Sequence, residues 1–378
     1  MSGVIDCPCC PPEPTRRGVL WGASALAGTL AVPGLTVAQQ RRSLPPLSVD
    51  SAKPNRDLPL IDFHTHIQKR AQADDLIQKM DATNVARLVL MPLYYGDNGG
   101  AVSDGEGSDE QARDYARRFP DRFVPFVGMQ RGELNGREAM RNVTDVGLRL
   151  LRQTGEKLAS GEFFGMGEFM LRFYPYTTAM GNVAVSDMDY PVDGWFMRQC
   201  ADFSARYRAP MVFHAEAEPH VAEAARRLFG AHPQAIFVWA HNCGRSSAAD
   251  IAAMFDRYPN LYADLGHMTY SGPGVNSYGA GWPRRTPWTY LVVDERGNLL
   301  PEMKALFERY PNRFTIGTDT AHARVYATYL DRIPRWRYVL GQLSPTTARG
   351  FAYANAERLF RMTTAGRQRF APLSPVPV

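Results

Sequence analysis

From residue 58 onward, short apolar runs alternate with stretches whose apolar residues recur at helical spacing. Eight of the runs are rich in β-branched and aromatic residues and are bounded by turn-forming residues, a pattern that predicts strands. The predicted strands span residues 58–63, 86–93, 122–129, 163–170, 209–216, 235–241, 260–266 and 313–320. Because the runs are almost continuously apolar, we expect parallel strands that are buried on both faces.

The stretches between these strands predict helices. They span residues 74–83, 108–119, 137–158, 193–206, 222–229, 247–258 and 301–310, and residues 324–340 and 345–361 follow the last strand. Eight alternations of strand and helix predict an α/β protein with a (β/α)₈ TIM barrel. A doubly wound parallel sheet is the alternative fold.

The N-terminal segment has a different pattern. Arg16 and Arg17 precede a weakly hydrophobic stretch of Ala, Gly and Leu, and Thr36 and Ala38 stand at the −3 and −1 positions of a possible cleavage site. This arrangement resembles a bacterial twin-arginine signal peptide. We therefore expect the twin-arginine export machinery to be a partner of the precursor.

This resemblance divides the chain into three parts. We expect a signal peptide over residues 1–38, a linker over 39–57 and the barrel over 58–378, with the mature protein in the periplasm or secreted. An uncleaved membrane anchor is the alternative, although Gly28 and Pro33 dilute an apolar stretch that is barely of bilayer length. After cleavage we expect no contact with a membrane.

Composition narrows the class of partner. The 378 residues are 45% hydrophobic and carry a formal net charge of +5 that is spread along the chain. Aromatic residues do not interleave with basic runs, so we expect no nucleic-acid partner. Cys200 and Cys243 are the cysteines that would remain after cleavage, and we expect them to be buried apolar residues and not a disulfide bridge.

Candidate chemistry begins at the end of the first predicted strand. His64 and His66 in "DFHTH" point to the same side of an extended chain, so their imidazoles can converge on one metal ion. The same two histidines could instead cap an exposed strand end.

Other strand ends carry similar residues. Glu168 stands in the fourth predicted strand, His214 in the fifth, His241 at the end of the sixth and Asp319 in the eighth. Singly, these could be core histidines, a strand-end charge or a helix N-cap. Barrel enzymes place their chemistry at the carboxyl ends of the strands, so together they predict one metal site.

Four of these motifs together resemble a known family. "DFHTH", "VFHAE", "WAHNCG" and "GTDTA" are similar to the amidohydrolase superfamily, specifically its amidohydrolase-related branch of metal-dependent hydrolases, over residues 58 to about 360. The resemblance implies a TIM barrel in which His64 and His66 bind a first metal and Asp319 is both ligand and proton shuttle.

The same resemblance implies roles for the remaining residues. His214 and His241 would bind a second metal, or His214 would bind a single metal while His241 activates water or orients the substrate. Many two-metal members carry a carbamylated lysine on strand four, which this chain lacks, and Glu168 would take that bridging place. We expect His64, His66, His214 and Asp319 to converge on one point, with one metal ion or two.

The ligand types suggest which metal is bound and what it does. Imidazoles and carboxylates suit Zn²⁺ first, with Mn²⁺, Fe²⁺ or Co²⁺ possible from the same set. A bound cation lowers the pKa of a water ligand to about 7 and can polarise a substrate carbonyl. Asp319 would accept the proton and return it to the leaving group.

Weaker candidates for substrate contacts lie near other strand ends. Tyr94 follows the second predicted strand, Arg172 follows Glu168, and His267 opens a long loop over residues 266–298. Long loops in compact domains are often functional, and the planar fork of arginine suits a substrate carboxylate. Tyr270, Trp282 and Arg284 are further candidates in this loop.

These features predict an exported metal-dependent hydrolase that acts on a small-molecule ester, lactone or amide. A nonoxidative decarboxylase of an aromatic or unsaturated acid is the alternative, because the same branch contains such enzymes. A catalytically inactive metal- or ligand-binding protein is the third possibility, and fold alone does not choose among them. The sequence does not indicate an oligomeric state.

Overall fold

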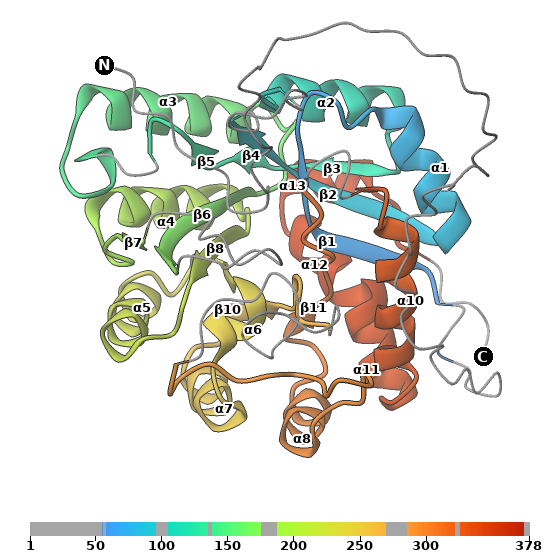
Figure 1. Cartoon of the computed structure of the whole chain (residues 1–378). Coiled ribbons are helices and arrows are strands. Elements are labelled where there is room, and N and C mark those ends of the chain that lie inside the picture. The colour runs from blue at the N-terminus through green and yellow to red at the C-terminus, as the bar shows by residue number, and fades with distance from the viewer. Residues whose placement is uncertain are drawn as a thin grey trace, which may run out of the picture.

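The computed structural model describes residue 55 and residues 58–95, 105–134, 138–174, 187–269, 286–321 and 326–373. Within them the chain forms the predicted (β/α)₈ barrel, with parallel strands inside and helices outside (Figure 1). The expected signal peptide and linker fall almost wholly outside the described residues.

The barrel wall consists of short strands. They are β1 (Leu60–Ile67), β2 (Val85–Tyr94), β3 (Phe123–Pro125), β4 (Val127–Gly128), β5 (Gln130–Arg131), β6 (Met166–Phe173), β8 (Met211–Ala215), β9 (Phe237–Trp239), β10 (Leu261–Asp264) and β11 (Phe314–Thr315). β1 pairs with β2 and β2 with β3, while β4, β6, β8, β9, β10 and β11 follow one another in a second parallel sheet. A two-residue strand, β7 (Met188–Asp189), pairs antiparallel with β6.

The first and last strands close the barrel. A parallel bridge joins Thr65 to Thr320, and the backbone N–H of Phe63 donates to the carbonyl of Ile316 at 3.0 Å. On the opposite side, β3 and β4 are separated only by Phe126, whose N–H donates to the carbonyl of Leu90. Closure brings the ends of β1 and β11 side by side.

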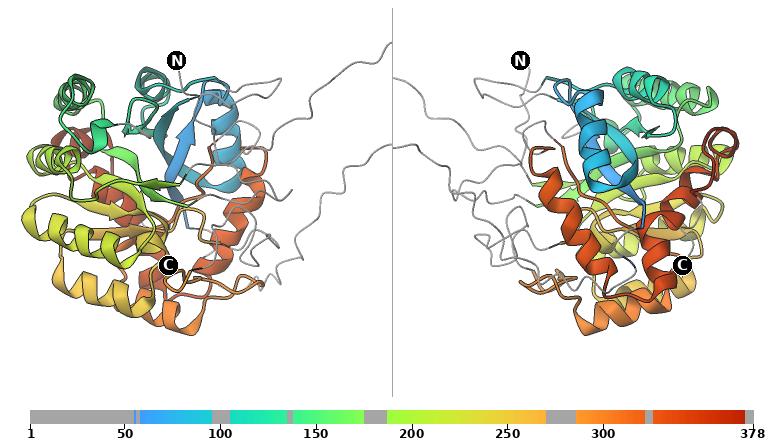
Figure 2. Two further views of the ribbon diagram at one scale, coloured as in Figure 1. Left: turned by 60° about the vertical axis from the view of Figure 1, so that its left-hand side comes forward. Right: turned by 90° about the vertical axis from the view of Figure 1, so that its right-hand side faces the viewer.

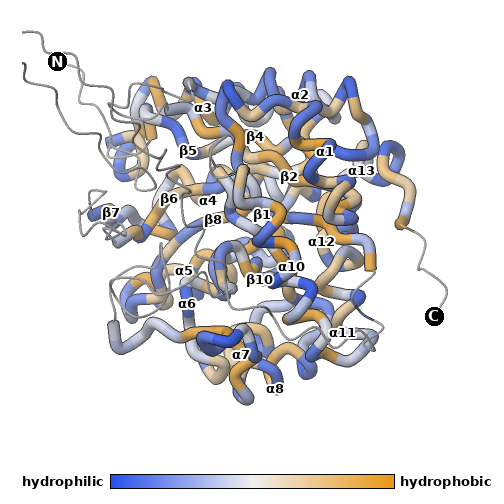
Figure 3. The backbone as a smooth tube through the Cα atoms, turned by 45° about the vertical axis from the view of Figure 1, so that its right-hand side comes forward, coloured by the Kyte–Doolittle hydropathy of each residue, from blue (hydrophilic) through white to orange (hydrophobic). Residues whose placement is uncertain are grey.

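Helices cover the outside of the barrel, as the two further views show (Figure 2). They are α1 (Ala73–Thr83), α2 (Asp109–Arg118), η2 (Glu138–Met140), α3 (Asp145–Ala159), α4 (Trp195–Tyr207), α5 (Pro219–Ala231), α7 (Ala248–Arg257), α8 (Pro301–Arg309), α10 (Tyr329–Leu340), α11 (Pro345–Arg349), η3 (Gly350–Ala354), α12 (Asn355–Phe360) and α13 (Thr364–Arg369). The segment labelled α6 (Ala240–Arg245) is instead a buried turn with positive φ at residues 241–245. Hydrophobic and hydrophilic residues alternate along many of these helices (Figure 3).

Local sequence explains where several helices begin. The side chains of Ser108, Thr144 and Ser247 accept a hydrogen bond from a backbone N–H in the first turn of α2, α3 and α7. Such caps satisfy donors that have no partner inside the helix. The cap at Thr144 also corrects the predicted helix over 137–158, because the regular helix begins only after it.

The core and the cysteines agree with the prediction. The apolar side chains of the strands and the inner helix faces are buried together, and Cys200 and Cys243 are buried free thiols. Among the described residues, no helix combines the length and apolarity needed to cross a bilayer.

Candidate metal centre

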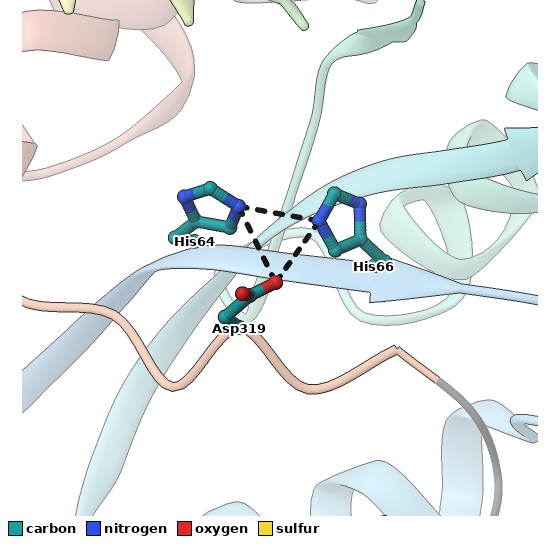
Figure 4. A group of neighbouring side chains, drawn as sticks. All are labelled: His64, His66 and Asp319. Atoms are coloured by element: carbon teal, nitrogen blue, oxygen red, sulfur yellow. Dashed lines mark hydrogen bonds and ion pairs between the residues drawn. The ribbon is translucent and has the colours of Figure 1, made fainter. Parts of the chain in front are cut away.

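Six predicted residues meet at one end of the barrel. They are His64 and His66 on β1, Glu168 on β6, His214 on β8, His241 just after β9 and Asp319 after β11. One ligand atom each from His64, His66 and Asp319 lie within 4.8 Å of one another, and so do atoms from His64, Glu168 and His241. The first group is drawn in Figure 4, where both Nε2 atoms face the Asp319 carboxylate.

Glu168 lies between two pairs of histidines. Its Oε2 atom is 3.5 Å from Nε2 of both His64 and His66. Its Oε1 atom is 3.4 Å from Nδ1 of His214 and 3.2 Å from Nε2 of His241. Glu168 therefore contacts all four histidines, with one carboxylate oxygen toward His64 and His66 and the other toward His214 and His241.

The outer nitrogens of the four imidazoles have partners that can only accept a hydrogen bond. Nδ1 of His64 lies 3.0 Å from the Asp264 carboxylate, and Nε2 of His214 lies 3.1 Å from Glu216. Nδ1 of His66 and of His241 face the carbonyl oxygens of Met91 and Gly266 at 3.1 and 2.7 Å. Each outer nitrogen must therefore carry a proton, and in a neutral ring the inner nitrogen presents a lone pair.

The inner atoms thus form a buried cluster of acceptors. Nε2 of His64 and Nε2 of His66 are 3.2 Å apart, although neither neutral ring has a proton to place between them. Oε1 of Glu168 is buried and receives no hydrogen bond within the described part of the chain. Carboxylate oxygens and imidazole lone pairs in this arrangement fit a divalent cation, which would supply the missing positive charge.

Without a cation, protons on the imidazoles supply the positive charge that balances the carboxylates. Burial alone would raise the pKa of Glu168, but His64 and the other imidazoles hold that pKa well below its usual value. Burial lowers the pKa of His64, but Asp264 and Glu168 outweigh burial and raise it well above its usual value. The carboxylates therefore stay ionised, which is the state that binds metal.

Exposure distinguishes Asp319 from the other five residues. Its side chain is 26% exposed, whereas the side chains of the others are at most 3% exposed. Asp319 is therefore the member of the cluster that solvent or a substrate can reach.

The backbone around Asp319 is fixed by a buried carboxylate on β1. Asp62 accepts hydrogen bonds from the N–H and the hydroxyl of Thr318 at 2.9 and 2.7 Å, and from the Tyr329 hydroxyl at 3.0 Å. The N–H of Asp319 donates to the carbonyl of His64 at 2.8 Å. These bonds explain why Asp319 can reach the cluster although β11 ends four residues earlier.

His241 is carried by a left-handed turn, which corrects its predicted place at the end of a strand. Residues 241–245 all have φ between +54° and +66°, and β9 already ends at Trp239. A Cβ atom on Gly244 would lie 2.0 Å from the carbonyl oxygen of Ala215, so only glycine fits there. The turn directs His241 toward Glu168 and returns Arg245 toward Glu216.

Gln130 on β5 orients the Glu168 carboxylate. Its side-chain nitrogen donates to Oε2 of Glu168 at 2.7 Å, and its side-chain oxygen accepts a hydrogen bond from the Tyr95 hydroxyl at 2.8 Å. This leaves Oε1 of Glu168 directed at His214 and His241.

Three weaker candidates lie outside the cluster. The Arg172 guanidinium is bound by Asp187 and Glu218, and its Nη1 donates to the carbonyl of Met188. Its contacts are thus with neighbouring acidic residues and not with the metal-binding set.

Tyr94 and His267 also have partners within the fold. The Tyr94 hydroxyl accepts a hydrogen bond from the N–H of Asp109, and its ring lies against the Arg131 guanidinium. His267 is half-buried, with Nδ1 3.4 Å from Arg332. Tyr270, Trp282 and Arg284 lie outside the described residues.

Sequence reasoning missed four residues that contact the cluster or its neighbours: Asp264, Glu216, Gln130 and Arg245. Asp264 and Glu216 were visible as carboxylates in predicted strands, and Glu216 follows His214 at the i+2 spacing that shares a face. Gln130 carried no distinguishing signal. Arg245 contacts Glu216 only because of the left-handed turn, and no sequence pattern predicts that turn.

Solved structures with related folds share little sequence with this chain. They include a TIM-barrel protein from Bordetella bronchiseptica (17% identity, 82% of this chain and 100% of that one, TM-score 0.49) and 2,6-dihydroxybenzoate decarboxylase from Rhizobium (14%, 80% and 98%, 0.43). A third is an amidohydrolase from Burkholderia multivorans with bound zinc (12%, 80% and 99%, 0.40). A search of curated proteins gave no match.

The sequence itself identifies the family. The model of the family described as amidohydrolase matches residues 61–362, which include all six residues of the cluster. The match thus spans the whole barrel from β1 to α12. The chain belongs to the amidohydrolase family.

Proposed function

We propose that this protein is a metal-dependent hydrolase that uses water to cleave a small-molecule ester, lactone or amide. The observation that carries the proposal is the position of Asp319, which combines contact with two buried imidazoles and a side chain that is 26% exposed. A carboxylate so placed can exchange a proton with a reacting molecule.

The cluster offers ligands for one ion or two. His64, His66 and Asp319 would hold the first, His214 and His241 the second, and Glu168 would bridge them. Zn²⁺ is the ion best suited to this set, and when bound it supplies a Lewis acid that polarises a carbonyl and makes water more acidic.

The residues of the chain supply the proton transfers. Asp319 accepts a proton from the attacking water and returns it to the leaving oxygen or nitrogen. If only one ion is bound, His241 is left to orient the substrate carbonyl. His241 is buried whereas Asp319 is partly exposed, so Asp319 is the group that solvent can reach.

Metal analysis followed by a substrate screen tests the proposal. Purified protein should contain a divalent metal, and a panel of lactones, esters, amides and aromatic acids should show hydrolysis that is lost on chelation and restored by metal. Release of carbon dioxide from an aromatic acid, with no hydrolysis of the other classes, would instead establish a decarboxylase. Metal binding without any turnover would favour a binding protein.

We also propose that the mature protein is exported. The paired arginines, the apolar stretch and the Thr36 and Ala38 positions support cleavage before Gln39. N-terminal sequencing of protein from the periplasm or medium should therefore begin near Gln39. Recovery of full-length chain from the soluble cytoplasm alone would contradict this.

A further inference from the structure

Glu216 is a fully buried carboxylate that contacts one of the cluster's imidazoles. It stands two residues after His214 on the same face of the chain, and its Oε1 atom lies 3.1 Å from Nε2 of His214. The same oxygen accepts a hydrogen bond from Nη1 of Arg245, which is also buried. An imidazole, a carboxylate and a guanidinium therefore form one continuous chain behind the site.

The orientation of the His214 ring means that its contact with Glu216 decides which ring nitrogen carries the proton. His64, His66 and His241 present Nε2 to the cluster, whereas His214 presents Nδ1. Its two neutral tautomers have opposite effects, because a proton on Nδ1 would occupy the lone pair that faces Glu168. A carboxylate at Nε2 can only accept, so it selects the tautomer that leaves Nδ1 free.

Arg245 stabilises the buried Glu216 carboxylate in its ionised form. An isolated carboxylate without solvent exposure carries a large desolvation penalty, which an adjacent guanidinium offsets. The left-handed turn that places His241 also places Arg245, so the same backbone feature serves both residues.

We propose that Glu216, neutralised by Arg245, is a positioning residue that fixes the tautomer and direction of His214. The pair sets the affinity for an ion that His214, His241 and Glu168 would hold. This inference rests on the proposed metal-dependent function, and it adds a role to two residues outside the ligand set.

The test compares Zn²⁺ affinity and tautomer in the whole protein. Glu216→Gln keeps the size of the side chain, but its single oxygen must serve Arg245 and His214 without a charge. We expect the dissociation constant for Zn²⁺, measured by competition with a chromophoric chelator, to rise about 10–100-fold. Arg245→Lys retains the positive charge and should raise the constant less than Glu216→Gln does.

A second buried Arg–Glu pair provides the matched control. Arg87 and Glu357 are 2.8 Å apart, with side chains 4% and 10% exposed, and neither contacts the cluster. Glu357→Gln should lower thermal stability but leave the dissociation constant for Zn²⁺ unchanged. Equal losses of affinity in Glu216→Gln and Glu357→Gln would overturn the proposal, because they would show a general effect of breaking a buried ion pair.

The tautomer is read directly from the wild-type protein, so a variant that fails to fold does not block the test. Long-range ¹H–¹⁵N correlation spectra of histidine-labelled, metal-free protein, at a pH where the His214 ring is neutral, should place its proton on Nε2. A proton on Nδ1 would overturn the proposal. Failure of the wild type to bind Zn²⁺ would count against the proposed function, whereas the tautomer would still decide the role of Glu216.

Discussion

Asp319 is tied to the cluster by its neighbours and yet open to solvent. The preceding residue, Thr318, donates a hydrogen bond to Asp62. The N–H of Asp319 donates to the carbonyl of His64. The His66 contact helps to hold the pKa of Asp319 below its usual value despite burial, so the group is ionised near neutral pH. An ionised, positioned and reachable carboxylate is what a proton acceptor requires.

Asp319→Asn should separate binding from chemistry. Asparagine keeps the size and one ligating oxygen but is not basic, so metal should remain bound while turnover falls by about 10²–10⁴-fold. Metal content and kcat are to be measured on the same samples, with an identified substrate and saturating metal. Near-normal turnover of loaded protein would show that Asp319 has only a structural role.

His64→Ala should act on metal affinity instead. The imidazole of His64 contacts His66, Glu168 and Asp319, so its loss removes a central ligand. We expect metal content to fall after dialysis and activity to recover in part with excess metal, because affinity is what is lost. His220→Ala, at a histidine that is 56% exposed, is the control and should change neither quantity.

Sequence patterns predicted the six residues that form the cluster but not the residues that orient them. All six predicted ligands lie in or just after predicted strands, where alternation and barrel geometry bring them together. Gln130 and Arg245 were not predicted, because their roles depend on contacts between segments far apart in the chain. The acidic partners of Arg172 lie on other segments for the same reason, and its contact with a substrate stays a prediction.

At the scale of elements, the left-handed turn at 241–245 is the least predictable part of the barrel. Four of its five residues are not glycine, and each such residue costs roughly 1–2 kcal/mol in this conformation. Strain of this kind persists where the surrounding structure enforces it, and here the turn directs both His241 and Arg245. Strand and helix patterns were otherwise sufficient to place nearly every barrel element.

Gly244→Ala tests the importance of this turn. The added Cβ would meet the carbonyl oxygen of Ala215 at 2.0 Å, and φ is +66°. We expect a loss of about 2–5 kcal/mol in the free energy of unfolding, together with weaker metal binding. Denaturant unfolding and metal titration measure the two effects.

Gly230→Ala is the matched control for that substitution. Gly230 lies within α5, and the nearest atom to its added Cβ is 3.8 Å away on Tyr258. The variant should be neutral or more stable by up to about 1 kcal/mol, because alanine is the better helix former. Equal stability of the two variants would mean that the turn can relax without cost.

At the scale of the whole molecule, the metal should contribute to stability. The cluster joins β1, β6, β8 and the segments after β9 and β11, so an ion there links most of the barrel wall. A bound ion would also relieve the repulsion between the Glu168 and Asp319 carboxylates. The folded state alone assembles these ligands, so binding favours it over the unfolded chain.

Removal of metal should therefore lower the Tm. A free metal concentration about 100 times the Kd stabilises the folded state by about 2.7 kcal/mol, which corresponds to several degrees in a barrel of this size. Thermal scans of chelated and reloaded protein measure the shift. An unchanged Tm in protein shown to bind metal would mean that the ligands are already held in place without the ion.

Closure of the barrel between β1 and β11 also has a consequence for the timing of synthesis. Asp62 and Thr318, whose hydrogen bonds place Asp319, are 256 positions apart. A ribosome that adds about 5–20 residues per second needs on the order of tens of seconds to make the intervening chain. Throughout that interval His64 and His66 lack Asp319, although Glu168, which also contacts them, is made earlier. Binding of an ion between β1 and the segment after β11 must therefore wait until translation is nearly complete.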